Sequence, residues 1–387
     1  MRKAHRWTRR QWLSAGLGVS LGAFLPKCGR PQSPAVAAAA DVPWLNEIQT
    51  PPAMLPADAP KVSSLLLDMA GQPITTRERW EQRRVELRRW WLDFLGPLPG
   101  KRNPSDAAPP TKLQVLEEDR EAGVIRQLVS YEVEPGATTE AYLLRPLELK
   151  ERAPGVAVFH STVNHTIRQP AGLEGPPEKH FGLHFAQQGC VCFCPRNFLW
   201  PATRVERLDA AGETAKWLAR VPGSKGMAKM LYDALVAIDI LAALPEVDVR
   251  RLGAVGHSLG AKEVLYLAAL DERVAASVSS EGGVGTRFSN WDAPWYLGPT
   301  IRDQAFTHEH HELLALAAPR PLLIVGGESA DGDRGWPLIE AAFPVWELYG
   351  RPVRFGQYNH RQGHAVPPQA LARIHEWLLT YLRWAAA

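Results

Sequence analysis

Cysteine, methionine and net charge are all scarce in this sequence. Only four cysteines and five methionines occur among 387 residues, and 44 basic against 41 acidic residues leave a net charge of +3. A charge this close to zero implies no polyanionic partner, and no basic stripe interleaved with aromatic residues appears, so nucleic acid is not expected as a ligand. The 45% of hydrophobic residues indicates a soluble globular protein with one large core, or with one core and a small appendage.

Three of the four cysteines alternate in one segment, GCVCFCP, as Cys190, Cys192 and Cys194. No second cysteine pair exists to complete a metal site with them. On a strand, side chains at this spacing share one face, and the extended backbone holds them too far apart for a disulfide. The segment is therefore predicted to be a buried central strand that uses cysteine as a small hydrophobic residue.

The apolar run near the N-terminus, QWLSAGLGVSLGAFL, is too short to span a bilayer. It follows Arg9 and Arg10, and four alanines at 37–40 offer a small-residue cleavage site before Asp41. Residues 1–40 are predicted to be an export signal of the twin-arginine type, so that the mature chain has no stable membrane span and acts in the periplasm or outside the cell. Lipid attachment at Cys28 is a second option.

Residues 41–111 are predicted to be a lead-in segment with one helix. Residues 41–75 are rich in proline and alanine, which favours an extended path. Residues 76–97 have apolar residues at helical spacing, with Thr75 or Thr76 as a plausible cap. The arginines of this helix are expected on a solvated face. The face expected to dock on the main domain consists of Trp80, Val85, Leu87, Trp91 and Leu95.

Residues 112–387 are predicted to form one α/β domain. Residues 112–147 alternate polar and apolar side chains, as antiparallel strands do. After them, short apolar runs such as GVAVFH, RLGAV and PLLIVGG alternate with helical segments. This order predicts a mostly parallel central sheet with helices on both faces and an antiparallel N-terminal edge. The long insertions 195–225 and 284–312 are expected to cap the active site.

The segment Gly256-His257-Ser258-Leu259-Gly260 lies between an apolar strand and a helix. A nucleophile on a tight strand–turn–helix needs small residues two positions before and after it, because larger side chains would collide with the neighbouring elements. Ser258 is therefore the predicted nucleophile. The turn also presents the Leu259 amide to a developing oxyanion, and the second donor is predicted to be the Thr162 amide, after the strand that ends at His160.

The catalytic base is predicted to be His364, in a loop before the last helix. Gly363 and Ala365 leave space for its imidazole, whereas His360 is expected to be a loop histidine bonded to backbone. For the acid, the position after PLLIVGG brings Glu328, Asp331 and Asp333 into play, with Asp331 the first choice and Asp333 next. Glu281 in SSEGGVG is a further candidate.

Two other features have open interpretations. Lys262, one turn beyond Ser258, either faces the pocket and binds a substrate carboxylate or hydroxyl, or lies on an exposed helix face. The histidine-rich segment 307–312 lacks the HExxH spacing of a metal site, so no metal is predicted there. A helix start with one histidine pointing into the cleft is expected instead.

From about residue 76 onward the chain resembles the α/β-hydrolase superfamily, in its dienelactone-hydrolase and prolyl-oligopeptidase-like branch. The resemblance rests on AVFHSTVNHTIRQPAGLEG, LPEVDVRRLGAVGHSLGAKE, ALAAPRPLLIVGG and the GHAVPP loop. It implies a Ser–His–acid hydrolase acting on an ester, less often an amide, without a cofactor. Acetyl xylan and glucuronoyl esterases are similar in the positions of Lys262 and Glu281, although glucuronoyl esterases usually carry arginine where this chain has Leu259.

The expected function is thus that of a serine carboxylic ester hydrolase acting on acylated or methyl-esterified saccharides outside the cytoplasm. A peptidase or acyl-peptide hydrolase of the same fold is one alternative, although the region before residue 150 is too short for a propeller domain. A non-catalytic cell-envelope binding protein is the other alternative.

Overall fold

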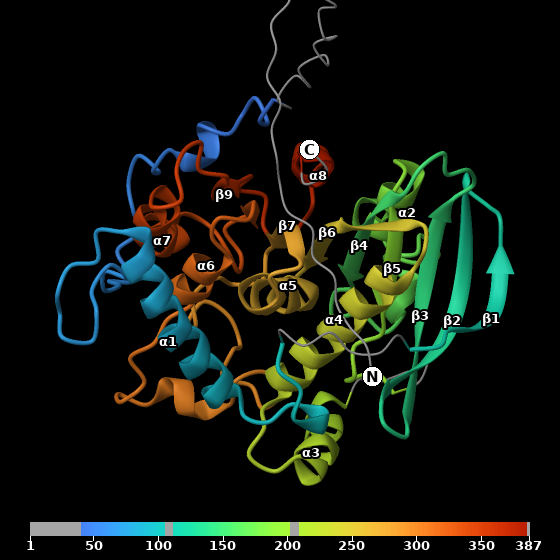
Figure 1. Ribbon diagram of the computed structural model, residues 1–387, viewed down its shortest axis with the longest axis horizontal. Helices are drawn as coiled ribbons and strands as arrows, with labels where there is room; N and C mark the ends of the chain where they lie inside the picture. The colour runs from blue at the N-terminus through green and yellow to red at the C-terminus, as the bar shows by residue number, and fades with distance from the viewer. Residues whose placement is uncertain (1–39, 105–110, 202–208, 385–387) are drawn as a thin grey trace, which may run out of the picture. The chain divides into compact units, whose positions relative to one another are not determined.

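A nine-stranded sheet forms the centre of the structure, which is a computed structural model (Figure 1). The structure describes residues 40–104, 111–201 and 209–384. The order of the strands is β1-β2-β3-β5-β4-β6-β7-β8-β9. Their bounds are β1 Gln114–Asp119, β2 Val124–Glu134, β3 Ala137–Pro146, β4 Ala153–Phe159, β5 Val191–Pro195, β6 Val247–His257, β7 Val274–Ser280, β8 Leu322–Gly326 and β9 Phe355–Asn359. The predicted export signal and Cys28 lie outside the described residues.

The direction of the strands matches the prediction of a mostly parallel sheet with an antiparallel N-terminal edge. β1, β2 and β3 pair antiparallel with one another, and β3 pairs antiparallel with β5. From β5 through β4 and β6 to β9, every pairing is parallel. Parallel strands need crossover connections, which the helices between them provide. The carboxyl ends of β6, β7, β8 and β9 therefore lie along one edge of the sheet.

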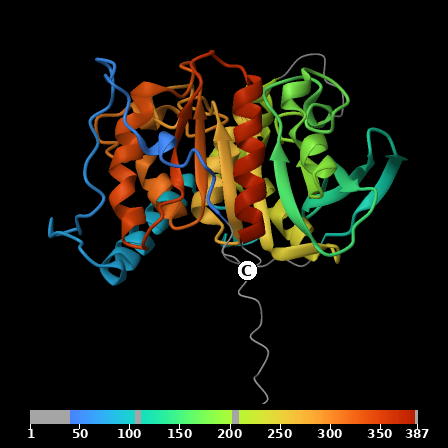
Figure 2. The same cartoon turned by 90° about the horizontal axis from the view of Figure 1, so that it is seen from above.

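Helices cover both faces of the sheet. Their bounds are α1 Arg77–Leu95, α2 Phe181–Gln187, α3 Ala210–Arg220, α4 Gly226–Ala243, α5 Leu259–Leu270, α6 His311–Ala317, α7 Trp336–Glu347 and α8 Pro368–Trp384. One core joins α1 and α3–α7 to one face, and a second core joins α2 and α8 to the other. Figure 2 shows α8 standing against the sheet. None of the described helices is long and apolar enough to cross a membrane.

Strand β5 confirms the prediction made for the cysteines. All three cysteines are fully buried and free, and they share the core on the α2 and α8 side, while Val191 and Phe193 between them face the other core. Burial raises the pKa of the Cys190 thiol to about 12, so it stays protonated and unreactive at neutral pH.

Helix α1 docks as predicted, except at two points. The side chain of Thr76 caps it by accepting from the Arg79 amide. Four of the five predicted docking residues are buried, but Val85 is 67% exposed because it points away from the core. The arginines are not all solvated: Arg84 and Arg88 donate to the carbonyls of Leu316 and Leu270, at the carboxyl ends of α6 and α5. These contacts place positive charge where a helix dipole favours it.

The lead-in segment packs along β9, the edge strand at one end of the sheet. Gln49 donates to the carbonyl oxygen of Val353 at 2.5 Å, and Ile48 is buried against β9. Gly356 of β9 has no room for a side chain, since an added Cβ would lie 2.4 Å from the Ile48 carbonyl oxygen. The segment therefore covers an edge strand that would otherwise expose unpaired backbone groups.

Candidate active site

Ser258 lies in the turn between β6 and α5, in a conformation that few serines adopt. Its φ is 61° and its ψ is −115°, in the region where a side chain on Cβ is crowded by its own backbone. The Ser258 amide donates to the carbonyl oxygen of Ser280 at 2.8 Å, which ties the turn to the neighbouring strand. The predicted strained turn between strand and helix is thus present, and the serine side chain projects from the carboxyl edge of the sheet.

The two glycines around Ser258 are required by close backbone contacts. A Cβ at Gly256 would lie 2.3 Å from the carbonyl carbon of Gly260, and a Cβ at Gly260 would lie 2.3 Å from the carbonyl oxygen of Phe159. Neither neighbour is a flexible side chain, so neither contact is relieved without moving the backbone. The predicted need for small residues two positions either side of the serine is confirmed.

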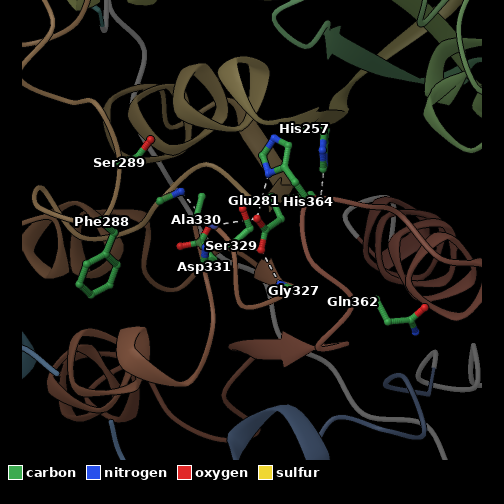
Figure 3. Close-up of polar contacts among 12 residues, drawn as sticks. His257, Glu281, Phe288, Ser289, Gly327, Ser329, Ala330, Asp331, Gln362 and His364 are labelled. Atoms are coloured by element: carbon green, nitrogen blue, oxygen red, sulfur yellow. Dashed lines mark hydrogen bonds and ion pairs between the residues drawn. The ribbon is translucent and has the colours of Figure 1, made fainter. Parts of the chain in front are cut away.

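His364 and Glu281 are in direct contact. The Nδ1 atom of His364 lies 2.9 Å from the Oε2 atom of Glu281 (Figure 3). Glu281 is the first residue after β7, and His364 lies in the loop between β9 and α8. The His364 ring also packs on His257, the residue before Ser258, with ring centroids 4.7 Å apart. The histidine is therefore brought to the turn that carries Ser258, with a carboxylate on its Nδ1 side.

Glu281 is held as an anion by backbone amides. Its side chain is fully buried, and it accepts hydrogen bonds from the amides of Ala330 at 2.8 Å and of Gly327. Burial by itself raises the pKa of Glu281, but the hydrogen bonds from His364 and from these amides outweigh it and leave the pKa below its ordinary value. The carboxylate stays ionised at neutral pH and accepts from the Nδ1–H of His364.

Asp331, the first choice for the acid, does not contact the histidine. Its two carboxylate oxygens accept from the amides of Gly283 at 2.9 Å and Val284 at 2.5 Å. It therefore shapes the loop that follows Glu281. Burial raises the pKa of Asp331 to about 6.

Asp333 is turned elsewhere, and accepts from Asn359 at 2.8 Å and from Arg361 at 2.6 Å. The carboxylate beside the histidine is thus the alternative candidate, Glu281. His360 behaves as expected for a loop histidine, since its Nδ1 accepts from the Gln362 amide at 3.1 Å.

The two predicted oxyanion donors line the same cavity. Thr162 and Leu259 lie on the wall of a cavity of about 330 Å³. Leu259 is the first residue of α5, so its amide has no acceptor within the helix. The rest of the wall comes from the two predicted capping insertions: Leu199, Asp209, Ala210, Ala211, Asn290, Trp295 and Tyr296.

Lys262 is buried, which rules out an exposed helix face. Only 4% of the residue is exposed, and its ammonium lies 3.8 Å from the centroid of the Trp291 ring. The ammonium has no hydrogen-bond partner among the described residues. Burial lowers the pKa of Lys262 to about 7, although Asp331 nearby acts in the opposite direction. A buried amine without an acceptor is unusual enough to need a role or a compensating contact.

The histidine-rich segment leads into the start of α6. Its rings contact protein groups: His308 with Glu312 at 2.8 Å, His310 with Tyr266 at 3.0 Å, and His311 with the Ser63 carbonyl at 3.1 Å. No group of three metal-ligating side chains is found in the described residues. None of these histidines is among the described residues that line the cavity beside Leu259.

Several residues of the site carried no sequence signal. Trp295 and Tyr296 line the cavity, and Trp291 lies under the Lys262 ammonium, yet the insertion that contains them has no periodic pattern. Only its length indicated a capping role. Its three aromatic residues within six positions could have drawn attention to a ligand site, but isolated aromatic residues more often belong to the core.

Comparison with known proteins is consistent with this geometry. A family model described as the dienelactone hydrolase family matches residues 139–318. The 4-O-methyl-glucuronoyl methylesterase 1 of Sodiomyces alcalophilus is 29% identical over 150 residues, which cover 31% of this chain and 30% of that protein. The dipeptidyl-peptidase 5 of Porphyromonas gingivalis is 27% identical over 214 residues, which cover 51% of this chain and 29% of that protein. The chain thus spans about a third of the length of these two relatives.

Solved structures extend the likeness to nearly the whole domain. The glucuronoyl esterase from Solibacter usitatus superposes with a TM-score of 0.60 at 20% identity, and the match covers 86% of this chain and 98% of that one. At this level of identity the likeness concerns the fold. The nine-stranded sheet, with its strand order and its serine turn, is an α/β-hydrolase fold.

Proposed function

We propose that the protein is a serine carboxylic ester hydrolase with Ser258, His364 and Glu281 as its catalytic triad. The observation that carries the proposal is the contact of His364 Nδ1 with the buried Glu281 carboxylate, beside the strained turn that presents Ser258. A carboxylate accepts but does not donate, so the Nδ1 atom carries the proton. The Nε2 atom of the neutral ring is then the one that accepts the proton of Ser258.

The reaction follows in two steps. Ser258 Oγ bonds to the acyl carbon while His364 Nε2 takes the serine proton, and the developing oxyanion is stabilised by the amides of Leu259 and Thr162. His364 then donates that proton to the leaving alcohol, and an acyl-enzyme remains. Water then completes the reaction. His364 takes a proton from water while the water oxygen bonds to the acyl carbon, the bond from that carbon to Ser258 Oγ breaks, the acid is released, and the proton returns from His364 to Ser258. Every proton stays within the triad and the reactants, so no cofactor enters the proposal.

The proposed substrate is an acylated or methyl-esterified saccharide. The cavity beside Leu259 is lined by Trp295 and Tyr296, and aromatic side chains pack well on sugar rings. Among the described residues, its wall carries one carboxylate, Asp209. Lys262, whose ammonium has no hydrogen-bond partner in the described part of the chain, is the proposed group for a substrate oxygen. Glucuronoyl esters are the substrates named for one relative and for the similar solved structure.

The site of action is proposed to be outside the cytoplasm, because the first forty residues have the three zones of an export signal in order. Cleavage after export gives a specific check: the N-terminus of protein isolated from the periplasm should begin near Asp41. An unprocessed N-terminus would contradict the export signal, and a lipid on Cys28 would favour the alternative of a lipoprotein.

The decisive assay compares esters with amides. Wild-type protein should hydrolyse 4-nitrophenyl acetate and a methyl or benzyl ester of glucuronic acid, and Ser258→Ala should not. A fluorophosphonate probe should label the wild type and not Ser258→Ala. Equal labelling of the two proteins, with no turnover, would support a binding protein in place of an enzyme.

One observation favours a second candidate, a peptidase, because a dipeptidyl-peptidase is among the relatives. Aminoacyl-4-nitroanilides test it directly. If only the anilides are hydrolysed, the protein is a peptidase and the ester proposal is wrong. If only esters are hydrolysed, the peptidase alternative is excluded.

A further inference from the structure

Glu263 is a buried acid that the proposed reaction does not use. It lies on α5, four residues after Leu259, so both residues are on the same face of the helix. Only 3% of Glu263 is exposed, and its Oε1 atom accepts from the side-chain amide of Asn197 at 2.9 Å. Burying a carboxylic acid costs free energy unless the acid is neutral or paired. The presence of Glu263 in this buried position therefore needs a physical explanation.

Asn197 has a single orientation, because its two side-chain ends have different partners. Its Oδ1 accepts from the Leu199 amide at 3.0 Å, so its amino group is the end that faces Glu263. Its backbone amide donates to His160 Nε2 at 3.2 Å. Asn197 therefore joins α5 to the residue that follows β4. No atom of this connection needs to be exposed, and Asn197 itself is 3% exposed.

His160 is hydrogen-bonded both to Asn197 and to the turn that contains Thr162. Its Nδ1 lies 2.7 Å from the Ser161 carbonyl oxygen, which only accepts, so Nδ1 carries the proton and Nε2 is the acceptor for Asn197. The Ser161 carbonyl also accepts from the Val163 amide at 2.9 Å. Two donors on one carbonyl fix the turn from Ser161 to Val163 and hence the direction of the Thr162 amide between them. Burial lowers the pKa of His160 to about 4, so this neutral arrangement persists across the working pH range.

We propose that Glu263 and Asn197 are positioning residues of the oxyanion site. Glu263 is on the same helix as Leu259, and its connection through Asn197 and His160 ends beside Thr162, so one helix sets the spacing of both donors. The proposal rests on the proposed function, since it assigns the Leu259 and Thr162 amides to the oxyanion. Glu263 touches no reacting atom. Burial raises the pKa of Glu263 well above its ordinary value, and the neutral acid keeps an acceptor for Asn197 without placing a charge under the nucleophile turn.

The test compares Glu263→Leu, which removes the acceptor, with Glu263→Gln, which keeps a neutral acceptor of the same shape. Loss of a whole oxyanion donor costs roughly 10²–10³ in kcat. A displaced donor costs less, so Glu263→Leu should lower kcat about tenfold to a hundredfold with KM unchanged. Glu263→Gln should keep most of the activity and an unchanged pH profile. Affinity for a boronic acid, which forms a tetrahedral adduct on the serine, should fall with kcat/KM in Glu263→Leu only.

Ser279→Ala is the matched control. The Ser279 hydroxyl is also buried and donates to an α5 carbonyl, that of Ala261, at 3.1 Å, but it has no link to the Thr162 turn. It should lower the melting temperature and leave kcat and boronate affinity unchanged. If Glu263→Leu does not fold, Asn197→Ala removes the same Glu263–Asn197 hydrogen bond from the donor side and should give the same loss.

Three results overturn the inference: unchanged kcat and boronate affinity in Glu263→Leu or Asn197→Ala, equal damage from Glu263→Gln and Glu263→Leu, or the same kinetic loss in Ser279→Ala. Failure of the proposed function looks different. In that case the wild type itself hydrolyses no ester, and Ser258→Ala behaves like the wild type.

Discussion

Replacing Glu281 by glutamine tests the triad at its third member. Oε2 of the carboxylate faces His364 Nδ1 and the Ala330 amide, and Oε1 faces the amides of Gly327 and Asp331. All four partners are donors when the ring is poised as a base. A glutamine has one oxygen and one amino group, so one of its ends must present N–H to a backbone N–H. Neither orientation of the amide satisfies the site.

The two orientations have different costs. With its amino group toward His364, the glutamine forces the ring into the tautomer that is protonated on Nε2, which cannot accept the serine proton. With its amino group toward Gly327, it sets N–H against the amides of Gly327 and Asp331, and a buried donor left without an acceptor costs about 1–3 kcal/mol. We therefore expect kcat to fall roughly 10³–10⁴-fold, the range known for the wrong histidine tautomer in a triad. Unfolding by urea should show a loss of about 1–3 kcal/mol.

Asp331→Asn is the matched comparison, because Asp331 also accepts from two backbone amides but not from His364. It should lose similar stability and keep kcat within about tenfold, the range of an indirect effect on loop geometry. Initial rates on 4-nitrophenyl acetate, measured for both variants at pH 7.5, decide between the two acids. If Glu281→Gln keeps kcat within tenfold of the wild type while Asp331→Asn loses a thousandfold, the acid is Asp331 and the reasoning from the contact is wrong.

Four further predictions rest on the same contacts. Ser258→Ala and His364→Ala should each lower kcat roughly 10⁴–10⁶-fold without changing the melting temperature by more than a few degrees; residual turnover above this range in either variant contradicts its assigned role. Lys262→Met should raise KM for a glucuronate ester but not for 4-nitrophenyl acetate, and equal effects on both would argue against a saccharide contact. The pKa of Lys262 in the folded protein, about 7, lies below its value in the unfolded chain. The free energy of unfolding of the wild type should therefore rise relative to that of Lys262→Met between pH 7 and pH 10, by up to about 4 kcal/mol in urea melts. If the two free energies of unfolding change with pH in parallel, the amine is not buried in solution. Gly260→Ala should unfold at clearly lower urea because its Cβ would lie 2.3 Å from the Phe159 carbonyl oxygen, and an unchanged midpoint would mean that the turn is looser than the contacts indicate.

Features set by neighbours in the chain were predictable from the sequence. The cysteine strand and the helix cap at Thr75 or Thr76 depend on residues a few positions apart, and both were predicted. The glycines around Ser258 were predicted from the strand–turn–helix pattern, although the contact that requires Gly260 comes from Phe159 of β4. The sheet was predictable for a related reason, because strands buried on both faces have apolar runs that differ from helical spacing. Val85 was assigned to the docking face against its spacing. It is five residues after Trp80 and two before Leu87, neither of which is a same-face spacing on a helix, and the structure leaves it exposed.

The acid depends on contacts between distant segments, which a single sequence does not reveal. Glu281 and His364 are 83 positions apart, and both Glu281 and Asp331 follow parallel strands that end at the same edge. The loop after β8 is shaped by its own turn, in which the amides of Gly327 and Glu328 donate to the Asp331 carbonyl. That turn directs the Asp331 side chain to Gly283 and Val284 and leaves the histidine to Glu281. Spacing alone could not choose between the two carboxylates.

At the carboxyl edge of the sheet, the backbone of the candidate active site is fixed mainly by strand pairing and less by the loops. Ser258 and Glu281, the first residues after β6 and β7, both have positive φ, at 61° and 55°. Such conformations cost of order 1–3 kcal/mol each and persist where surrounding contacts enforce them. Here each strained residue donates its amide to the adjacent strand, Ser258 to the Ser280 carbonyl and Glu281 to the Val325 carbonyl, both at 2.8 Å. The backbone hydrogen bonding between the strands thus extends one residue beyond each strand, to Ser258 and Glu281. It places both residues at the same edge of the sheet. Substitutions that weaken the pairing of β6, β7 and β8 should therefore lower the rate of ester hydrolysis before they unfold the protein. Changes in the capping insertions 195–225 and 284–312 should instead alter substrate preference and leave the triad intact.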